Sequence, residues 1–176
     1  RLNRSPAIFD ITKLTWMNGV YLRALPAEKF HELALPYYHN MPSFVDTKAL
    51  SATLQPRVET LGDIPAQTDF ICELPDYALD LYSNKKMKTD AAVARQNLPA
   101  IRETLSLQSE WNNQALFETL KALAEKLGVK NGQILYPARI ALSGKETTPG
   151  GATEIAVILG KNETLRRIDE AIKKLA

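Results

Sequence analysis

The sequence predicts an all-α fold, in which short, proline-kinked helices form a cage or superhelix of two subdomains. Apolar residues recur at three- and four-residue spacings through most of the 176 residues, and this spacing gathers side chains on one face of a helix. Alternation at period two is scarce, and strands bounded by hairpin dipeptides are not evident. Pro56, Pro99 and Pro137 each lie inside a window that otherwise suits a helix, and they should kink or split helices rather than abolish them. About ten short helices are therefore expected, stacked in a curved array.

Several helix starts can be recognised in the first half of the chain. Asp10 can cap a helix that carries Leu14, Met17 and Leu22, because an aspartate side chain accepts hydrogen bonds from the free N–H groups of a first turn. That helix should end before Pro26, since proline suits the first turn of the next helix. The following candidates are 27–35, 46–61, 63–71 and 76–82.

Two apolar stripes mark the clearest helices of the second half. Asn112 or Asn113 can cap the first of them, and Gly128 can supply the left-handed residue that ends it. The last helix repeats this logic, with Asn162 as a cap candidate and Gly160 closing the helix before it. The stripes consist of Leu116, Leu120, Leu123 and Leu127, and of Leu165, Ile168, Ile172 and Leu175.

The polar stretch 83–90 is the best internal seam, so we expect one helical subdomain over 1–89 and a second over 90–176. The formal net charge of +2 is nearly balanced, whereas domains that hold nucleic acid by bulk electrostatics are usually much more basic. Any RNA contact should therefore be local. Two cationic groups are interpreted as ordinary solvated surface. They are Lys85, Lys86 and Lys88, and Arg166, Arg167, Lys173 and Lys174.

The single cysteine, Cys72, cannot form an internal disulfide or a multi-cysteine zinc site. Neither a secretory signal nor a membrane span of roughly 18 apolar residues is present. These features predict a soluble, cytoplasmic protein in a reducing compartment, and we expect a monomer. Because the chain begins at Arg1 rather than at a methionine, an excised fragment is expected.

The sequence offers little for catalysis. His31 and His39 make no recognised ligand spacing with nearby acidic residues, and packing or surface roles are expected for both. The glycines near the C-terminus lack the ending of a phosphate-binding loop, and Ser143 lacks the flanking pattern of a nucleophile elbow. An autonomous enzyme is therefore not expected, and no metal or cofactor is predicted for this chain.

The tract from Thr147 to Gly151 has a different physical use. Its hydroxyls, its stiff proline and its two glycines suit close approach of the main chain to exposed base edges. Tyr136 and Arg139 lie three apart on a helix and can present a ring and a guanidinium together, and RNA loops are read by such stacking and edge contacts. The alternative is an ordinary interhelical loop beside a partly buried tyrosine.

Two distant segments together carry a family resemblance. From Ser5 the chain reads SPAIFDITKLTWMNGVYLR, and from Leu135 it reads LYPARIALSGKETTPGGATEIAVILG. In this order and separation they resemble the anticodon-binding region of bacterial-type glutamyl-tRNA synthetases. In that family a catalytic class I domain and a stem-contact region precede an α-helical cage that binds the anticodon. The resemblance covers essentially the whole chain, although 24–128 matches in helical character and scattered positions only.

The resemblance implies roles for individual residues of the closing subdomain. Tyr136 takes the stacking position and Arg139 the base-reading position. Thr148 and Pro149, with Gly150, take the place of the loop that meets the anticodon. One departure is Gly151, where many members have a bulky apolar residue; the other is Tyr136, where some relatives have tryptophan.

A specificity position is also implied in the first subdomain. In the family, Arg or Gln on one helix separates enzymes that charge only the glutamate tRNA from those that also charge the glutamine tRNA. The matching stretch contains Gln55 and Arg57, and the sequence leaves open which of them faces RNA. For Arg57, a surface ion pair with Glu59 or Asp63 is the alternative.

The resemblance therefore implies the recognition half of a glutamate–tRNA ligase. The partner would be the glutamate tRNA, with the glutamine tRNA left open. ATP and Mg²⁺ would bind the catalytic half, whose motifs are absent from these residues. A helical protein-interaction scaffold is the main alternative, and an independent enzyme with an unrecognised site is another.

Overall fold

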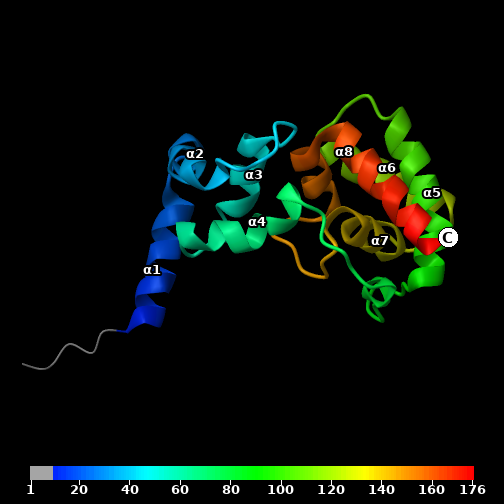
Figure 1. The fold of residues 1–176 in the computed structure, drawn as a ribbon, viewed down its shortest axis with the longest axis horizontal. Helices are drawn as coiled ribbons and strands as arrows, with labels where there is room; N and C mark the ends of the chain where they lie inside the picture. The colour runs from blue at the N-terminus through cyan, green and yellow to red at the C-terminus, as the bar shows by residue number, and fades with distance from the viewer. Residues whose placement is uncertain (1–9) are drawn as a thin grey trace, which may run out of the picture.

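The computed structural model describes residues 10–176 and is helical in this range. It has eight α-helices and three short 3-10 helices, and its only extended pairing among the described residues is an isolated bridge between Asn84 and Thr89. The predicted all-α class is confirmed. Figure 1 shows two groups of helices, α1–α4 and α5–α8, that lie side by side along the longest axis. No helix in 10–176 is long and apolar enough to cross a membrane.

The first group contains α1 (Ile11–Ala24), α2 (Ala27–Ala34), α3 (Thr47–Leu54) and α4 (Ile64–Cys72). The predicted caps hold, since the Asp10 carboxylate accepts a hydrogen bond from the Lys13 amide at 3.1 Å. Asp46 caps α3 through two amides. The helix predicted over 46–61 ends earlier, at Leu54, because Pro56 has no N–H to continue it. The motif residues Ser5 to Phe9 lie outside the described residues.

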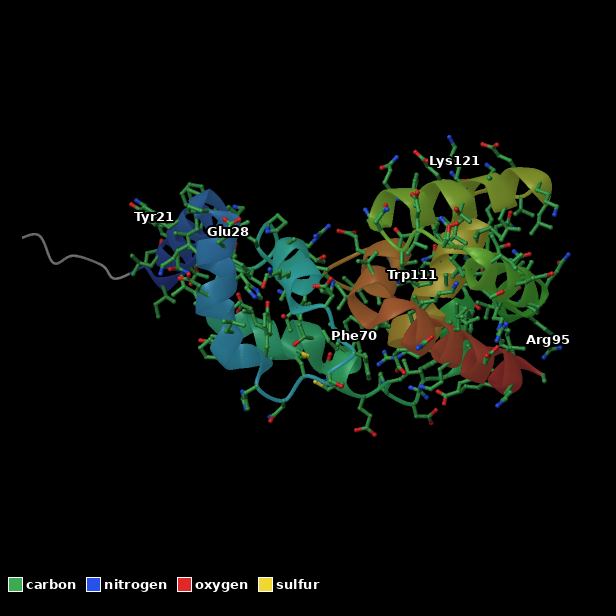
Figure 2. All side chains as sticks on the ribbon, turned by 90° about the horizontal axis from the view of Figure 1, so that it is seen from above. Tyr21, Glu28, Phe70, Arg95, Trp111 and Lys121 are labelled. Atoms are coloured by element: carbon green, nitrogen blue, oxygen red, sulfur yellow. The ribbon has the colours of Figure 1, made fainter. Side chains whose placement is uncertain are left out.

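Helix α1 packs little against the rest of the chain. Only Gly19 and Leu22 of this helix are buried, whereas Trp16 is 57% exposed and Tyr21 is 69% exposed. Figure 2 shows Tyr21 at the end of the molecule away from α5–α8. The side-chain amide of Gln55, directly after α3, donates to the carbonyls of Leu22 and Leu25 at the C-terminal end of α1 and so links the two helices.

The second group contains α5 (Ala91–Leu107), α6 (Asn113–Lys126), α7 (Gly132–Ser143) and α8 (Ala152–Leu175). The Asn112 side chain caps α6, and Gly128 adopts a φ of +67° just beyond the end of the helix. Gly160 breaks α8 with a φ of +73° and a ψ of 167°. These positions confirm the predicted cap, stop and break.

Both internal prolines of this group lie within continuous helices, as Pro99 does in α5 and Pro137 in α7. Pro137 has no N–H for the carbonyl of Gln133, one turn earlier. The buried amide of Asn97 donates to that carbonyl instead, at 2.9 Å. A side chain from α5 thus replaces the missing backbone hydrogen bond of α7, and the helix continues.

One connection differs from its prediction. The helix predicted over 76–82 is an irregular strap that contains only the 3-10 helix Leu79–Tyr82. The seam at 83–90 is a tight turn whose ends pair at Asn84 and Thr89. The strap crosses from α4 to α5, and its Tyr82 is fully buried.

The two groups are joined by Arg167, which was predicted to be surface but is only 1% exposed. Its guanidinium donates to the carbonyls of Phe70 and Ile71 at 2.8 and 2.9 Å and to that of Leu142 at 2.7 Å. It also donates to the Glu163 carboxylate at 2.7 Å. These carbonyls belong to the last turns of α4 and α7, where backbone acceptors have no helical partner. One cation therefore closes two helix ends from different groups.

Candidate nucleic-acid interface

The loop between α7 and α8 forms one side of the candidate interface. Gly144 ends α7 with a φ of +62°, and an added Cβ would lie 2.9 Å from the Tyr77 ring. The chain then turns outward through 145–151. The Thr148 hydroxyl donates to the Gly150 carbonyl at 2.6 Å, and the Glu154 carboxylate accepts from the Gly151 amide at 2.7 Å. These bonds fix the loop against the first turn of α8.

This loop borders a concave depression of about 360 Å³ between the two groups of helices. The other side is formed by α4 and by the residues that follow α3. Figure 2 shows Phe70 at the junction of the two groups. The lining includes Arg57, Gln67, Phe70, Lys145, Thr148 and Pro149. Three of the residues singled out from the sequence, namely Arg57, Thr148 and Pro149, thus share one surface although they are far apart in the chain.

Arg57 faces this depression and is held on both sides. Its guanidinium donates to the Thr53 carbonyl at 2.6 Å and pairs with the Glu154 carboxylate at 3.2 Å, with 39% of its side chain exposed. The ion pair therefore crosses to α8 rather than to Glu59 or Asp63. Of the two specificity candidates, Arg57 lines the depression, whereas Gln55 is engaged by the end of α1.

Arg139 supports the loop from α7. One guanidinium nitrogen donates to the Glu146 carbonyl at 3.3 Å. Its Nε is buried and has no hydrogen-bond partner within the part of the chain that the structure describes. A donor without a partner is costly when buried, and a buried Nε is out of reach of a ligand, so only the terminal guanidinium nitrogens remain for such a contact. Arg139 does not line the depression itself.

Tyr136 does not have the geometry of a stacking residue. Its side chain is buried, with 4% exposure, and its hydroxyl donates to the Leu81 carbonyl at 3.2 Å. A base needs an open ring face, which this tyrosine does not offer. The stacking role predicted for Tyr136 is therefore corrected. The ring packs under the strap, whereas Arg139, one turn later, is half-buried.

Sequence reasoning missed several residues of the depression, among them Lys145, Gln67 and Phe70. Lys145 directly follows the glycine that ends α7, and its position beside the threonine-rich loop was a usable signal. Gln67 and Phe70 come from α4, far from the loop in the chain, and no local pattern indicated them. Long-range packing alone brings these two residues to the site.

The side chains of both histidines are engaged by neighbouring residues. The imidazole of His31 is within 2.8 Å of the Ser51 hydroxyl, and the Nδ1 of His39 donates to the Pro36 carbonyl at 2.9 Å. Both histidines thus have packing and surface roles. Among residues 10–176, no three His, Cys, Asp or Glu side chains are grouped as metal ligands.

Known proteins resemble this chain in sequence and fold. A family model described as anticodon binding domain matches residues 29–172. Glutamate–tRNA ligases of Clostridium tetani and Clostridium acetobutylicum are 47% and 46% identical over 99% of the chain, which spans 36% of each relative. A crystal structure of a glutamate tRNA ligase from Elizabethkingia meningosepticum has a TM-score of 0.77 at 23% identity, covering 96% of this chain and 33% of that one. A glutamate-tRNA synthetase from Elizabethkingia anophelis has a TM-score of 0.73 at 24% identity and covers 94% and 32%. The chain belongs to the anticodon binding domain family.

Proposed function

We propose that this chain is the anticodon-recognition part of a glutamate–tRNA ligase. The observation that supports this most strongly is the 47% identity to the Clostridium tetani ligase over 99% of the chain. The chain spans about a third of the length of the relatives it matches, 36% in that case. The whole ligase would attach glutamate to its tRNA in an ATP-dependent reaction. ATP and Mg²⁺ would bind the catalytic part, and this chain would hold no cofactor.

In this proposal the depression receives the unpaired bases of the anticodon loop. Arg57 would read a base edge from the first subdomain, and Thr148 and Pro149 would present side-chain and main-chain groups from the second, while buried Gly150 would hold the loop in shape by accepting a hydrogen bond from the Thr148 hydroxyl. Arg139 would position this loop through the Glu146 carbonyl and offer a terminal guanidinium nitrogen to a base. Single-stranded RNA is read by hydrogen bonds to base edges, and such contacts do not need a sheet or a groove-binding helix.

The finer features of the partner and assembly are part of the same proposal. The ligand would be the glutamate tRNA, with the glutamine tRNA accepted or rejected at Arg57. The protein would act as a monomer in the cytoplasm. The two subdomains, 1–89 and 90–176, would each supply one wall of the depression, so both would be needed for binding.

The test is footprinting of a glutamate tRNA transcript by the chain, combined with Arg139→Ala. Protection should be confined to the anticodon loop. The variant should bind about 5- to 160-fold more weakly, because a lost base contact costs about 1–3 kcal/mol. Arg95→Ala is the matched control, since it removes the same charge from α5. Figure 2 shows Arg95 at the end of the molecule opposite to Tyr21. The affinity of Arg95→Ala for the transcript should therefore stay within about twofold of the wild-type value.

The outcomes separate the function from the residue assignment. Protection of the acceptor arm alone, or no protection by the folded chain, would overturn the proposed function. Protection of the anticodon loop with equal affinity for both variants would leave the function standing and remove Arg139 from the interface.

A further inference from the structure

Lys145 lines the depression but is paired with a carboxylate outside its lining, and the anticodon proposal does not use this ion pair. The Lys145 ammonium lies 2.5 and 2.6 Å from the two oxygens of the Asp69 carboxylate. Asp69 belongs to α4 and Lys145 follows α7, so the pair crosses between the two groups of helices. The ammonium also lies 5.9 Å from the centre of the Phe70 ring. These contacts fix the position of the Lys145 ammonium beside the depression.

The contribution of this pair to stability is small. The lysine side chain is 32% exposed and the aspartate side chain 56% exposed, and exposed ion pairs add little because water and salt screen them. Exchanging the carboxylate for another anion therefore carries a small penalty. An ammonium has three donors, and the two contacts with Asp69 leave one that is free for a ligand.

The surroundings favour an RNA phosphate as that ligand. Lys145 lines the depression together with Thr147 and Thr148, so the backbone of a nucleotide whose base meets this loop would run beside the ammonium. Arg57, the other cation of the lining, is paired with Glu154 of α8. Of the two cations in the lining, Lys145 has the more exposed carboxylate partner. The Asp69 side chain is 56% exposed, whereas the Glu154 side chain that pairs with Arg57 is 28% exposed.

We propose that Lys145 is an additional RNA contact, which binds a phosphate of the anticodon loop, and that Asp69 competes with this phosphate while it holds the lysine in place. The inference rests on the proposed function, because it assigns a phosphate partner within the same site. Its distinctive consequence is a sign: removing the negative charge of Asp69 should strengthen RNA binding, although it removes an ion pair.

The experiment measures the affinity of a glutamate tRNA transcript for the chain at several salt concentrations. Asp69→Asn keeps the shape of the side chain and leaves an oxygen for Lys145. Asp76→Asn is the matched control, because Asp76 pairs with Lys174, whose side chain is also 32% exposed and which does not line the depression. Both variants raise the net charge by one and release a lysine of equal exposure, although Asp76 is itself more exposed than Asp69, at 98% against 56%.

Asp69→Asn should bind the transcript about two- to fivefold more tightly, the range for release of an exposed ion pair. Its log–log salt slope should be no shallower than that of the wild type, in which the Lys145 contact already contributes about 0.7, the value for one phosphate on a single strand, or about 2.6-fold in affinity between 50 and 200 mM salt. Asp76→Asn should match the wild type. Lys145→Met should weaken binding, and the double variant of Asp69 and Lys145 should lose the gain.

Weaker binding by Asp69→Asn, or equal gains at Asp69 and Asp76, would overturn the proposal and assign the pair a structural role. If Asp69→Asn does not fold, Lys145→Met provides the test. The log–log salt slope of its affinity for the transcript should be shallower by about 0.7 than that of Lys174→Met, the control that removes the other lysine. An unchanged slope overturns the proposal. Failure of the wild type to protect the anticodon loop would instead overturn the proposed function, and this inference with it.

Discussion

Replacing Arg167 by alanine tests whether one buried cation joins the two groups of helices. The substitution leaves the carbonyls of Phe70, Ile71 and Leu142 without their donor, in a place where the arginine is 1% exposed. An unsatisfied buried acceptor costs about 1–3 kcal/mol, and removing one partner of a buried ion pair costs about 3–5 kcal/mol. Because these effects overlap, we expect the free energy of unfolding to fall by about 3–5 kcal/mol.

The neighbouring Arg166 is the matched control. It makes three hydrogen bonds to the carboxylates of Glu163 and Glu170, but its side chain is 51% exposed. Arg166→Ala removes the same charge and also one partner of Glu163, and it should cost at most about 1 kcal/mol. The two variants therefore differ mainly in whether backbone carbonyls lose a donor.

The assay is urea unfolding followed by circular dichroism, with thermal unfolding as a second measurement. A domain of this size loses about 2–4 °C of Tm per kcal/mol, so Arg167→Ala should melt about 6–20 °C lower than the wild type. Equal losses for the two variants would refute the account in which Arg167 closes the ends of α4 and α7.

Two further predictions concern pH and the corrected tyrosine. Burial opposes ionisation of Glu163, but hydrogen bonds from its two arginine partners outweigh it and hold its pKa below the ordinary 4.5. The stabilisation that ionised Glu163 provides should be fully present above about pH 4.5 and lost as pH falls through the folded-state pKa. The free energies of urea unfolding of the wild type and of Glu163→Gln should therefore become equal in acid. A difference that stays constant with pH would contradict this. Tyr136→Phe removes one hydrogen bond, to Leu81, and should cost about 0.5–1.5 kcal/mol of stability with no change in tRNA affinity, whereas a weaker complex at unchanged stability would restore a direct role for the ring.

Local chemistry made most helix boundaries predictable. Asp10 and Asn112 act through side-chain oxygens on the first turn, and Gly128 and Gly160 act through φ values that other residues rarely adopt. The continuity of α7 through Pro137 was less accessible, because it depends on Asn97 from another helix. Caps and breaks depend on residues close together in the sequence. The continuity of a helix through a proline can depend on a side chain from another helix that replaces the missing hydrogen bond.

The same distinction explains the candidate site. The loop at Thr148 and Pro149 could be recognised from its composition, but its position beside Arg57 required the packing of α8 against α3. Tyr136 and Arg139 were correctly placed on one helix, yet spacing alone did not show that the strap covers the tyrosine. For Arg167 a signal existed, because it lies three residues after buried Thr164 and four before buried Ala171.

The contact of Arg167 with Phe70 spans 97 positions of the chain. A ribosome adds about 5–20 residues per second, so α4 would wait about 5–20 s for the guanidinium that completes its last turn. During that interval the early helices would expose backbone acceptors and apolar surface meant for a later segment. Translation speed across α5–α7 would then set how long the nascent chain is vulnerable to proteases and aggregation.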